Sequence, residues 1–264
     1  MNADSRYGIN AHLPSVEEMQ AVAQLQAPWV RLDFNWYDIE PVREGYDFRL
    51  TDSIVYPLVA QGFQLYPTLS YTPEWANGGQ GRTSPPANWY NFVAHVATHY
   101  QGAIRYWGLW NEPNGSGMSV AQYVNLILHP GHDALKAVDP ANGVAGPDLA
   151  TEGTWRRWLT TMLDRGQQYL DYLTVHSYQS NGHAIIDAVD QIRSRGLPIA
   201  LTETGWNSDD IGEEAQADHV QQFLESLPHS NAIKMFLFDL NSPGFGILGK
   251  PAFAVYQSYT VPAV

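Results

Sequence analysis

Two glutamates stand at the ends of short apolar runs with strong strand propensity, and this is where paired catalytic carboxyl groups are expected. Glu112 follows the run Ile104 to Trp110, and Pro113 after it prevents the strand from continuing. Glu203 follows the run Ile199 to Thr202. Two carboxyl groups beside an anomeric carbon can hydrolyse a glycosidic bond, because one protonates the departing oxygen and the other attacks or activates water. Taken singly, Glu112 also fits a solvated turn and Glu203 a structural salt bridge.

Short β-prone runs alternate with longer helix-like segments along the whole chain, and Gly or Pro stands at many of the joins. The expected strands cover residues 7–12, 29–34, 64–71, 104–110, 143–146 or a little beyond, 172–178, 199–202 and 233–240. The expected helices cover residues 15–26, 52–61, 88–100, 120–137, 154–165, 184–195, 214–226 and 251–259. Ser15 and Glu18 have the spacing of a capping box at the start of the first helix.

This alternation implies parallel strands joined by right-handed crossovers. Eight units predict one α/β domain over residues 1–264, a single (β/α)₈ TIM barrel. An open doubly wound sheet would give the same alternation. Eight units exceed what such sheets commonly use, and no Gly-rich phosphate turn follows the first strand. The barrel is therefore the predicted fold.

The carboxyl ends of the strands in a barrel meet at one face, where barrel enzymes place their active sites. Glu112 ends the fourth expected strand and Glu203 the seventh, so we expect both side chains at that face. The irregular stretches 35–51, 72–87 and 241–250 all follow strands. They are expected to form the walls of a substrate groove.

The two motifs Trp110-Asn111-Glu112-Pro113 and Thr202-Glu203-Thr204-Gly205-Trp206 resemble the signatures of the clan A glycoside hydrolases. These are retaining barrel enzymes such as cellulases, mannanases, xylanases, galactanases and xylosidases. The resemblance implies that Glu112 is the acid/base and Glu203 the nucleophile. The segments Val30–Asp33, Tyr71–Ala76 and His176–Tyr178 are most similar to family 39, which includes β-xylosidases, α-iduronidases and bacterial exopolysaccharide endoglycosidases.

The mechanism that this resemblance implies is double displacement, with the two carboxyl groups roughly 5–5.5 Å apart. Once Glu203 carries its charge, Glu112 is harder to ionise and stays available as the acid. Arg31 is expected to pair with Glu203, the alternative being a core ion pair. Tyr178 resembles a tyrosine that binds the nucleophile, and His176 a contact to the sugar or the acid/base. Both could instead fill the core.

Several further residues are expected to bind the carbohydrate. Asn111 is a neutral donor suited to a sugar hydroxyl, and His12 at the end of the first strand is a weaker candidate. Sugar rings stack on aromatic rings, so tryptophans in or beside the loops of the active face are candidate platforms, namely Trp36, Trp75, Trp110 and Trp206. The other tryptophans are expected in the core: Trp29, Trp89, Trp107, Trp155 and Trp158. Glu74 is either a subsite residue or solvated.

The end of the eighth expected strand departs from the clan pattern. Many members carry a tryptophan there, whereas this chain reads Phe236 to Asn241 without one. Either Phe238 replaces it, or Asp239 and Asn241 bind polar groups of the sugar. The chain also has no room for the β-sandwich found in many family 39 exo-enzymes. We therefore expect an endo-acting enzyme.

The composition limits the classes of molecule that the protein is expected to bind. A formal net charge of −13 repels nucleic acid and anionic membranes, while neutral polysaccharides remain compatible; the alternative is that the charge only confers solubility. The chain has no cysteine and no His-x-His spacing, so we expect neither a metal nor a cofactor. No apolar run is long enough to span a membrane. We expect a monomer, secreted or periplasmic with its signal peptide removed rather than cytoplasmic.

Two other functions are compatible with a barrel. A non-catalytic carbohydrate-binding barrel would be marked by loss of a carboxylate, and here both are present. A hydrolase or lyase of another class would need metal ligands, a phosphate loop or a lysine at the active end of a strand. Lys234 is the only lysine in an expected strand, and it lies near the beginning.

Overall fold

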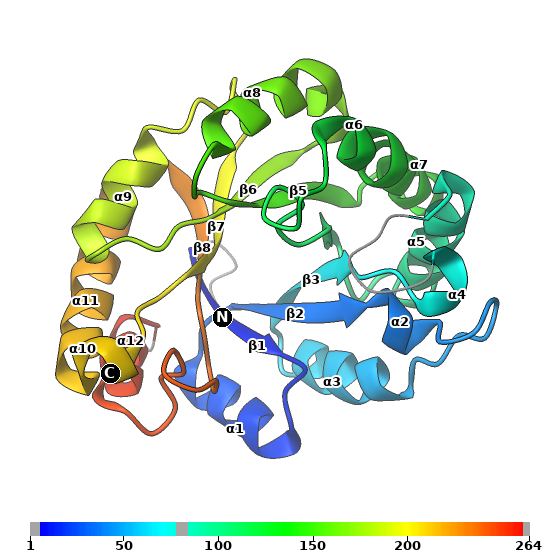
Figure 1. The fold of residues 1–264 in the computed structure, drawn as a ribbon. Coiled ribbons are helices and arrows are strands. Elements are labelled where there is room, and N and C mark those ends of the chain that lie inside the picture. Colours follow the sequence, from blue (N-terminus) through cyan, green and yellow to red (C-terminus); the bar gives the residue numbers. More distant parts are fainter. Residues whose placement is uncertain (1–5, 78–83, 261–264) are drawn as a thin grey trace.

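The computed structural model, which describes residues 6–77 and 84–260, is a closed barrel of eight parallel strands (Figure 1). The strands follow one another in sequence order, and the last pairs with the first. They are β1 (Tyr7–His12), β2 (Trp29–Asn35), β3 (Gln64–Ser70), β4 (Tyr106–Leu109), β5 (Gly143–Ala150), β6 (Tyr172–His176), β7 (Ile199–Thr204) and β8 (Ala232–Leu237). The predicted barrel is confirmed.

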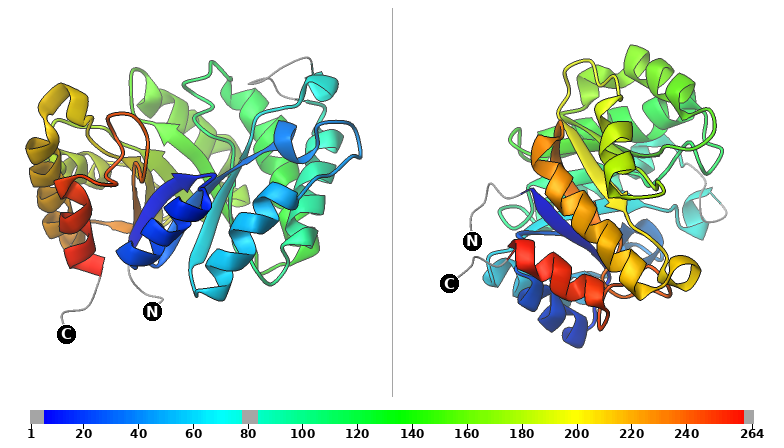
Figure 2. Two further views of the ribbon diagram at one scale, coloured as in Figure 1. Left: turned by 90° about the horizontal axis from the view of Figure 1, so that it is seen from below. Right: turned by 90° about the vertical axis from the view of Figure 1, so that its left-hand side faces the viewer.

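Helices surround the barrel on its outside (Figure 2). The longer ones are α1 (Val16–Leu25), α3 (Arg49–Ala60), α5 (Pro86–His99), α7 (His129–Val138), α8 (Trp155–Gly166), α9 (Gly182–Asp190), α11 (Glu213–Ser226) and α12 (Pro251–Thr260). Shorter ones are α2 (Trp36–Ile39), α4 (Glu74–Asn77), α6 (Val120–Gln122) and α10 (Ser208–Ile211). Within the described ranges, no helix has the length and apolar character needed to cross a membrane.

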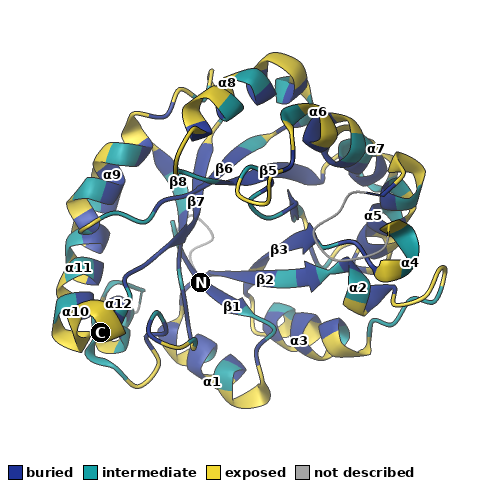
Figure 3. Ribbon diagram, viewed as in Figure 1, coloured by how far each residue is buried: buried dark blue, intermediate teal, exposed yellow. Residues whose placement is uncertain are grey.

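The strands and the helices differ in how much of their surface is buried (Figure 3). The strands have side chains on both faces covered, so β7 is buried at every position. The helices bury one face only; α1 buries Met19, Ala21, Val22 and Leu25 and exposes Gln20 and Gln24. The capping box predicted for α1 is present, with Ser15 accepting from the Glu18 amide and Glu18 accepting from the Ser15 amide.

The structure differs from the predicted elements mainly at their ends and in the loops. Strand β4 is shorter than predicted, because Trp110 adopts a φ of 75° and leaves the extended conformation. The helix predicted over 120–137 contains a π-helical section, Tyr123–Leu128, between α6 and α7. Helices α2, α4 and α10 were not predicted, since four residues are too few to show a hydrophobic period. Part of the predicted loop 72–87 lies outside the described residues.

Left-handed backbone occurs repeatedly near the carboxyl ends of the strands. The φ angles are 55° at His12, 63° at Tyr71, 75° at Trp110, 46° at Glu112 and 50° at Asp148. Non-glycine residues seldom adopt this conformation, and it gathers at functional sites where the surrounding structure maintains it. It also re-aims side chains, so the alternation of a strand no longer tells which side chains face the barrel mouth.

Candidate active site

The two predicted glutamates meet at the carboxyl ends of β4 and β7. One carboxylate oxygen of Glu112, one of Glu203 and Nδ1 of His176 all lie within 4.8 Å of one another. The Glu203 residue is 8% exposed, whereas the side chain of Glu112 is 35% exposed and reaches into the groove. The amide of Glu112 donates to the carbonyl of Asp148 at 3.1 Å, which fixes the turn after β4. This separation suits the two carboxyl groups of a retaining glycosidase.

His176, the last residue of β6, bridges the two carboxylates. Its Nδ1 lies 2.7 Å from Oε1 of Glu112 and 3.3 Å from Oε2 of Glu203. Its Nε2 is buried and has no hydrogen-bond partner among the described residues. His176 thus connects the two carboxyl groups through its Nδ1 atom.

Glu203 is held by one cation and one hydroxyl. Nη1 of Arg31 lies 2.8 Å from Oε1, and the Tyr178 hydroxyl donates to Oε2 at 2.8 Å. Burial, and then the negative charge of Glu203, raise the pKa of Tyr178, so the phenol keeps its proton and remains a donor. Arg31 is only 2% exposed, and its pairing with carboxylates keeps it charged. Both contacts hold the carboxyl group of Glu203 in one orientation.

His12 ends β1 and lies between two carboxylates. Its Nδ1 is 2.9 Å from Oδ2 of Asp33, and its Nε2 is 3.0 Å from Oδ2 of Asp239. Burial alone would lower the pKa of His12, but the hydrogen bonds to Asp239 and Asp33 raise it to about 10. His12 is therefore an imidazolium at neutral pH, in the lining of a hollow that also contains Glu203.

Asp239 was predicted to bind polar groups of the sugar, and the structure corrects this. Its side chain is completely buried, with Oδ1 accepting from the amide and hydroxyl of Ser242 and Oδ2 paired with His12. A substrate cannot reach a carboxylate that is already enclosed. Asp239 instead orients His12, which lines the groove.

We expect the charged form of His12 to contribute stability with a defined pH dependence. Because its pKa is raised from 6.5 to about 10, this contribution is complete below pH 6.5 and is lost as the pH rises towards 10. The melting temperature of wild type minus that of His12→Asn should therefore be largest near pH 6 and vanish near pH 10. A difference that stays constant from pH 6 to pH 10 would show that the ion pairs are not formed.

The groove at the barrel mouth extends to both sides of Glu203. A hollow of about 660 Å³ runs from Glu112 to Trp206, and a second of about 220 Å³ contains His12 and Tyr71; both are lined by Glu203 and Phe238. A third hollow of about 440 Å³ shares Asp33 and Asn35 with the second. Because they share these lining residues, the three hollows lie next to one another beside Glu203.

The remaining predicted carbohydrate-binding residues differ in position. Asn111 lines the groove, but its Oδ1 accepts from Arg31 Nη2 at 2.8 Å and its Nδ2 donates to Tyr71 at 3.4 Å. Trp206 also lines the groove, with Nε1 bonded to the carbonyl of Gln179. Phe238, at the position where a clan tryptophan was sought, lines both hollows that contain Glu203.

Two of the predicted platform tryptophans are corrected by the structure. Trp36 and Trp110 are completely buried, so neither presents a ring face to a sugar. Trp36 packs on Trp89, as does Trp110, because the turns after β2 and β4 direct both rings towards the surrounding helices. Trp75 in α4 is partly buried, with Arg43 stacked 5.0 Å from its ring centre. It does not line the hollows described above.

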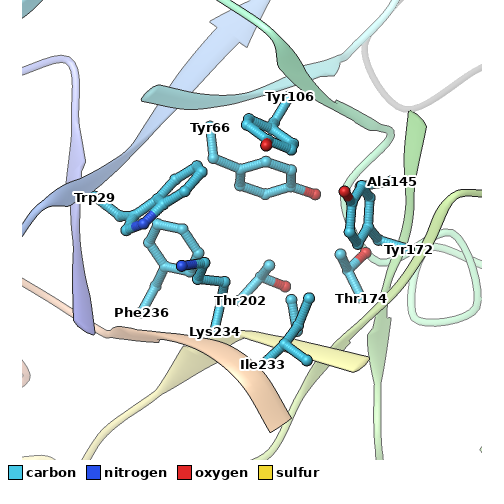
Figure 4. Close-up of a pocket in the computed structure, with 11 residues that line it drawn as sticks. Trp29, Tyr66, Tyr106, Ala145, Tyr172, Thr174, Thr202, Ile233, Lys234 and Phe236 are labelled. Carbon is cyan, nitrogen blue, oxygen red and sulfur yellow. The ribbon is translucent and has the colours of Figure 1, made fainter. Parts of the chain in front are cut away.

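The opposite end of the barrel holds a cavity of about 210 Å³ without a pair of carboxylates (Figure 4). Its lining includes the first residues of three strands, Trp29, Tyr106 and Tyr172, which places it at the amino ends of the strands. Lys234 lies there with Nζ 4.7 Å from the centre of the Trp29 ring. A lysine at this end cannot serve the chemistry of the barrel mouth, in agreement with the sequence argument.

Metal ligation was not expected, yet Glu112, His176 and Glu203 have suitable atoms at suitable spacing. Among the residues that the structure describes, they are the one group of three such side chains within 4.8 Å. The same set also suits proton transfer, because Nδ1 of His176 lies within hydrogen-bond distance of Glu112, at 2.7 Å. Independence from metal remains a prediction.

Comparison with known proteins shows what this site and fold are similar to. The sequence matches the family described as "Glycosyl hydrolase catalytic core" over residues 84–236, more than half of the chain, with both Glu112 and Glu203 inside the match. No curated protein matches the sequence significantly.

Three solved structures share the fold. A family 39 glycoside hydrolase from the gut symbiont Bacteroides cellulosilyticus WH2 has a TM-score of 0.79 and 19% identity, over 97% of this chain and 63% of that one. A family 39 β-xylosidase from Caulobacter crescentus has a TM-score of 0.75 and 20% identity, over 97% and 71%. An endo-β-1,4-glucanase from Xanthomonas axonopodis pv. citri with a triple mutation has a TM-score of 0.74 and 15% identity, over 97% and 99%. The chain thus spans less than two thirds of the first of these enzymes. Sequence identities this low show similarity of fold alone.

Proposed function

The chain belongs to the glycosyl hydrolase catalytic core family, and from this we propose that it is a retaining glycoside hydrolase with Glu203 as nucleophile and Glu112 as acid/base. One observation carries the proposal: an oxygen of each carboxyl group lies within 4.8 Å of the other. Inverting enzymes need roughly 6.5–9.5 Å for the water between their carboxyl groups, and retaining enzymes roughly 5–5.5 Å. The spacing supports direct attack by Glu203.

In the first step Glu203 attacks the anomeric carbon while Glu112 transfers its proton to the departing oxygen. The bond from the anomeric carbon to that oxygen breaks, and an ester to Glu203 forms. Arg31 and Tyr178 orient the attacking carboxylate, since they bond to its two different oxygens. His176 lies between the two carboxyl groups and orients the carboxyl group of Glu112 that carries the proton.

In the second step Glu112, now a carboxylate, removes a proton from water. The water attacks the anomeric carbon from the side that the leaving group vacated, and the ester bond to Glu203 breaks. The sugar is released with its original configuration, and both glutamates regain their starting protonation states. The partial exposure of Glu112, with 35% of its side chain accessible, gives this water a route to the ester.

We propose an endo mode of cleavage on a neutral polysaccharide. Two hollows are lined by Glu203, one that also contains Asp33 and Asn35 and one that also contains Gln179 and Trp206, which supports binding of sugar units on both sides of the cleavage point. An exo-acting enzyme would need a wall at one side of the cleavage point. Phe238, which lines both hollows beside Glu203, is the candidate ring beneath the sugar that is cleaved. The alternative is an exo-acting enzyme similar to β-xylosidases.

Product analysis over time on a panel of polysaccharides tests both parts of this proposal. We expect a ladder of oligosaccharides from the earliest time points, measured by mass spectrometry, together with a rapid fall in viscosity. The Glu203→Gln variant is the matched inactive control. Release of only mono- or disaccharide from the start would replace the endo mode by the exo mode. No hydrolysis of any polysaccharide or aryl glycoside would contradict the enzyme itself and favour a carbohydrate-binding barrel.

A further inference from the structure

Asp148 is a completely buried carboxylate beneath the catalytic pair, and none of the steps above uses it. It lies in β5, where β5 and β6 pair Gly146 with Leu173 but Leu149 with Val175, so β5 contains one extra residue between these pairs. Such bulges re-aim side chains beside active sites. With its φ of 50°, Asp148 is directed into the barrel interior rather than continuing the alternation of the strand.

Four donors surround the two oxygens of Asp148. Oδ1 accepts from the Tyr66 hydroxyl at 3.0 Å and from the Thr202 hydroxyl at 2.9 Å. Oδ2 accepts from Nη2 of Arg31 at 3.0 Å and from the Thr68 hydroxyl at 2.9 Å. Burial alone would raise the pKa of Asp148, but opposing contributions, with the charge of Arg31 the largest, lower the pKa. Asp148 is therefore a fixed negative charge.

Arg31 connects this charge to the nucleophile. Its Nη1 bonds to Glu203 and to the side-chain oxygen of Asn10, both at 2.8 Å, while its Nη2 bonds to Asp148 and Asn111. One guanidinium thus pairs with two buried carboxylates, and the negative charge of Asp148 offsets part of the positive potential that Arg31 creates at Glu203.

The two-step mechanism makes the second anion necessary. When Glu203 forms the ester its negative charge disappears, and Arg31 would become a buried cation without a partner. An unpaired buried charge is strongly destabilising. Asp148 keeps its charge throughout, so Arg31 stays neutralised and in place until water releases the sugar.

We propose that Asp148 is a positioning residue that shares Arg31 with Glu203, moderating the pull of Arg31 on the nucleophile and neutralising Arg31 while Glu203 is esterified. The neutralisation of Arg31 during esterification rests on the proposed function. The sharing of Arg31 between two carboxylates does not, since it is a property of the resting protein. Asp148 touches no substrate and acts only through Arg31.

The kinetic arm of the test uses Asp148→Asn, which keeps the shape and removes the charge. We expect kcat/KM to fall roughly 10- to 100-fold, mainly through kcat, as when a reacting group is misplaced by a small distance. The acid limb of the pH–rate profile should move to lower pH, because the whole charge of Arg31 then acts on Glu203. An unchanged pH profile with normal kcat would overturn the proposal.

A matched pair of tyrosines provides the control and a milder variant. Tyr66 and Tyr172 line the same cavity at the amino ends of the strands (Figure 4), but only the Tyr66 hydroxyl bonds to Asp148. If Asp148→Asn does not fold, kcat of Tyr66→Phe tests the proposal instead. We expect a several-fold fall in kcat with Tyr66→Phe and no change with Tyr172→Phe. Equal effects of both variants would overturn the proposal.

The second arm needs no activity. Glu203→Gln and Asp148→Asn each leave Arg31 with one carboxylate, and the double variant leaves it with none. We expect the melting temperature of the double variant to fall by about 4 °C or more beyond the sum of the two single losses. Adding Arg31→Met to the double variant should remove this extra loss. Additive losses would overturn the sharing of Arg31. If the wild type hydrolyses no glycoside, the proposed function fails while this cycle still decides the role of Asp148.

Discussion

Replacing Glu203 with alanine is expected to lower kcat by about 10⁵-fold or more on every substrate, because the variant has no group that can form the covalent intermediate. The side chain leaves a space lined by Arg31 and Tyr178, which are both donors. Azide is a small anion and should bind there. It should attack the anomeric carbon and yield a glycosyl azide of inverted configuration, detected by NMR and mass spectrometry.

The control for this prediction is Glu214→Ala. Glu214 is an exposed glutamate in the first turn of α11, on the outside of the barrel, so its removal should leave the rate unchanged. Full activity of Glu203→Ala would end the assignment of Glu203 as nucleophile. A glycosyl azide of retained configuration would show that a different carboxylate forms the ester.

Replacing Glu112 with alanine is expected to have an effect that depends on the leaving group. General acid catalysis contributes about 10²- to 10⁴-fold, so natural substrates should lose roughly that factor. Aryl glycosides with an activated phenol need no proton from the enzyme and should still react in the first step. The second step lacks its base, so the glycosyl-enzyme should accumulate and be visible by intact-protein mass spectrometry.

Azide distinguishes the two glutamates. In Glu112→Ala it should attack the glycosyl-enzyme from the side of the missing carboxyl group and give a glycosyl azide of retained configuration. The same loss on activated and natural substrates would contradict the role of Glu112 as the acid.

The fold and the meeting of Glu112 with Glu203 could be predicted because both depend on patterns that are local in the sequence. The alternation of runs gave eight strands, and the count of strands placed Glu112 and Glu203 at the same face. That argument needs only that carboxyl ends of parallel strands converge. It does not need the direction of any side chain.

The burial of individual side chains could not be predicted in the same way. Trp36 and Trp110 follow strands and were expected to face the groove, but the backbone turns directly after β2 and β4 and buries both rings. Asp148 was missed because the fifth strand was expected to end near Gly146, which placed the aspartate in a loop. A carboxylate inside the apolar run from Gly143 to Ala150 was the available signal.

The stereochemistry of the first product tests the central claim most directly. Proton NMR of the reaction mixture within the first minutes shows which anomer forms before the two anomers equilibrate. Attack by Glu203 followed by water predicts that the first anomer has the configuration of the bond that was cleaved. A first anomer of the opposite configuration would mean that water attacks the anomeric carbon directly. The carboxylate spacing within 4.8 Å would then not indicate a retaining mechanism.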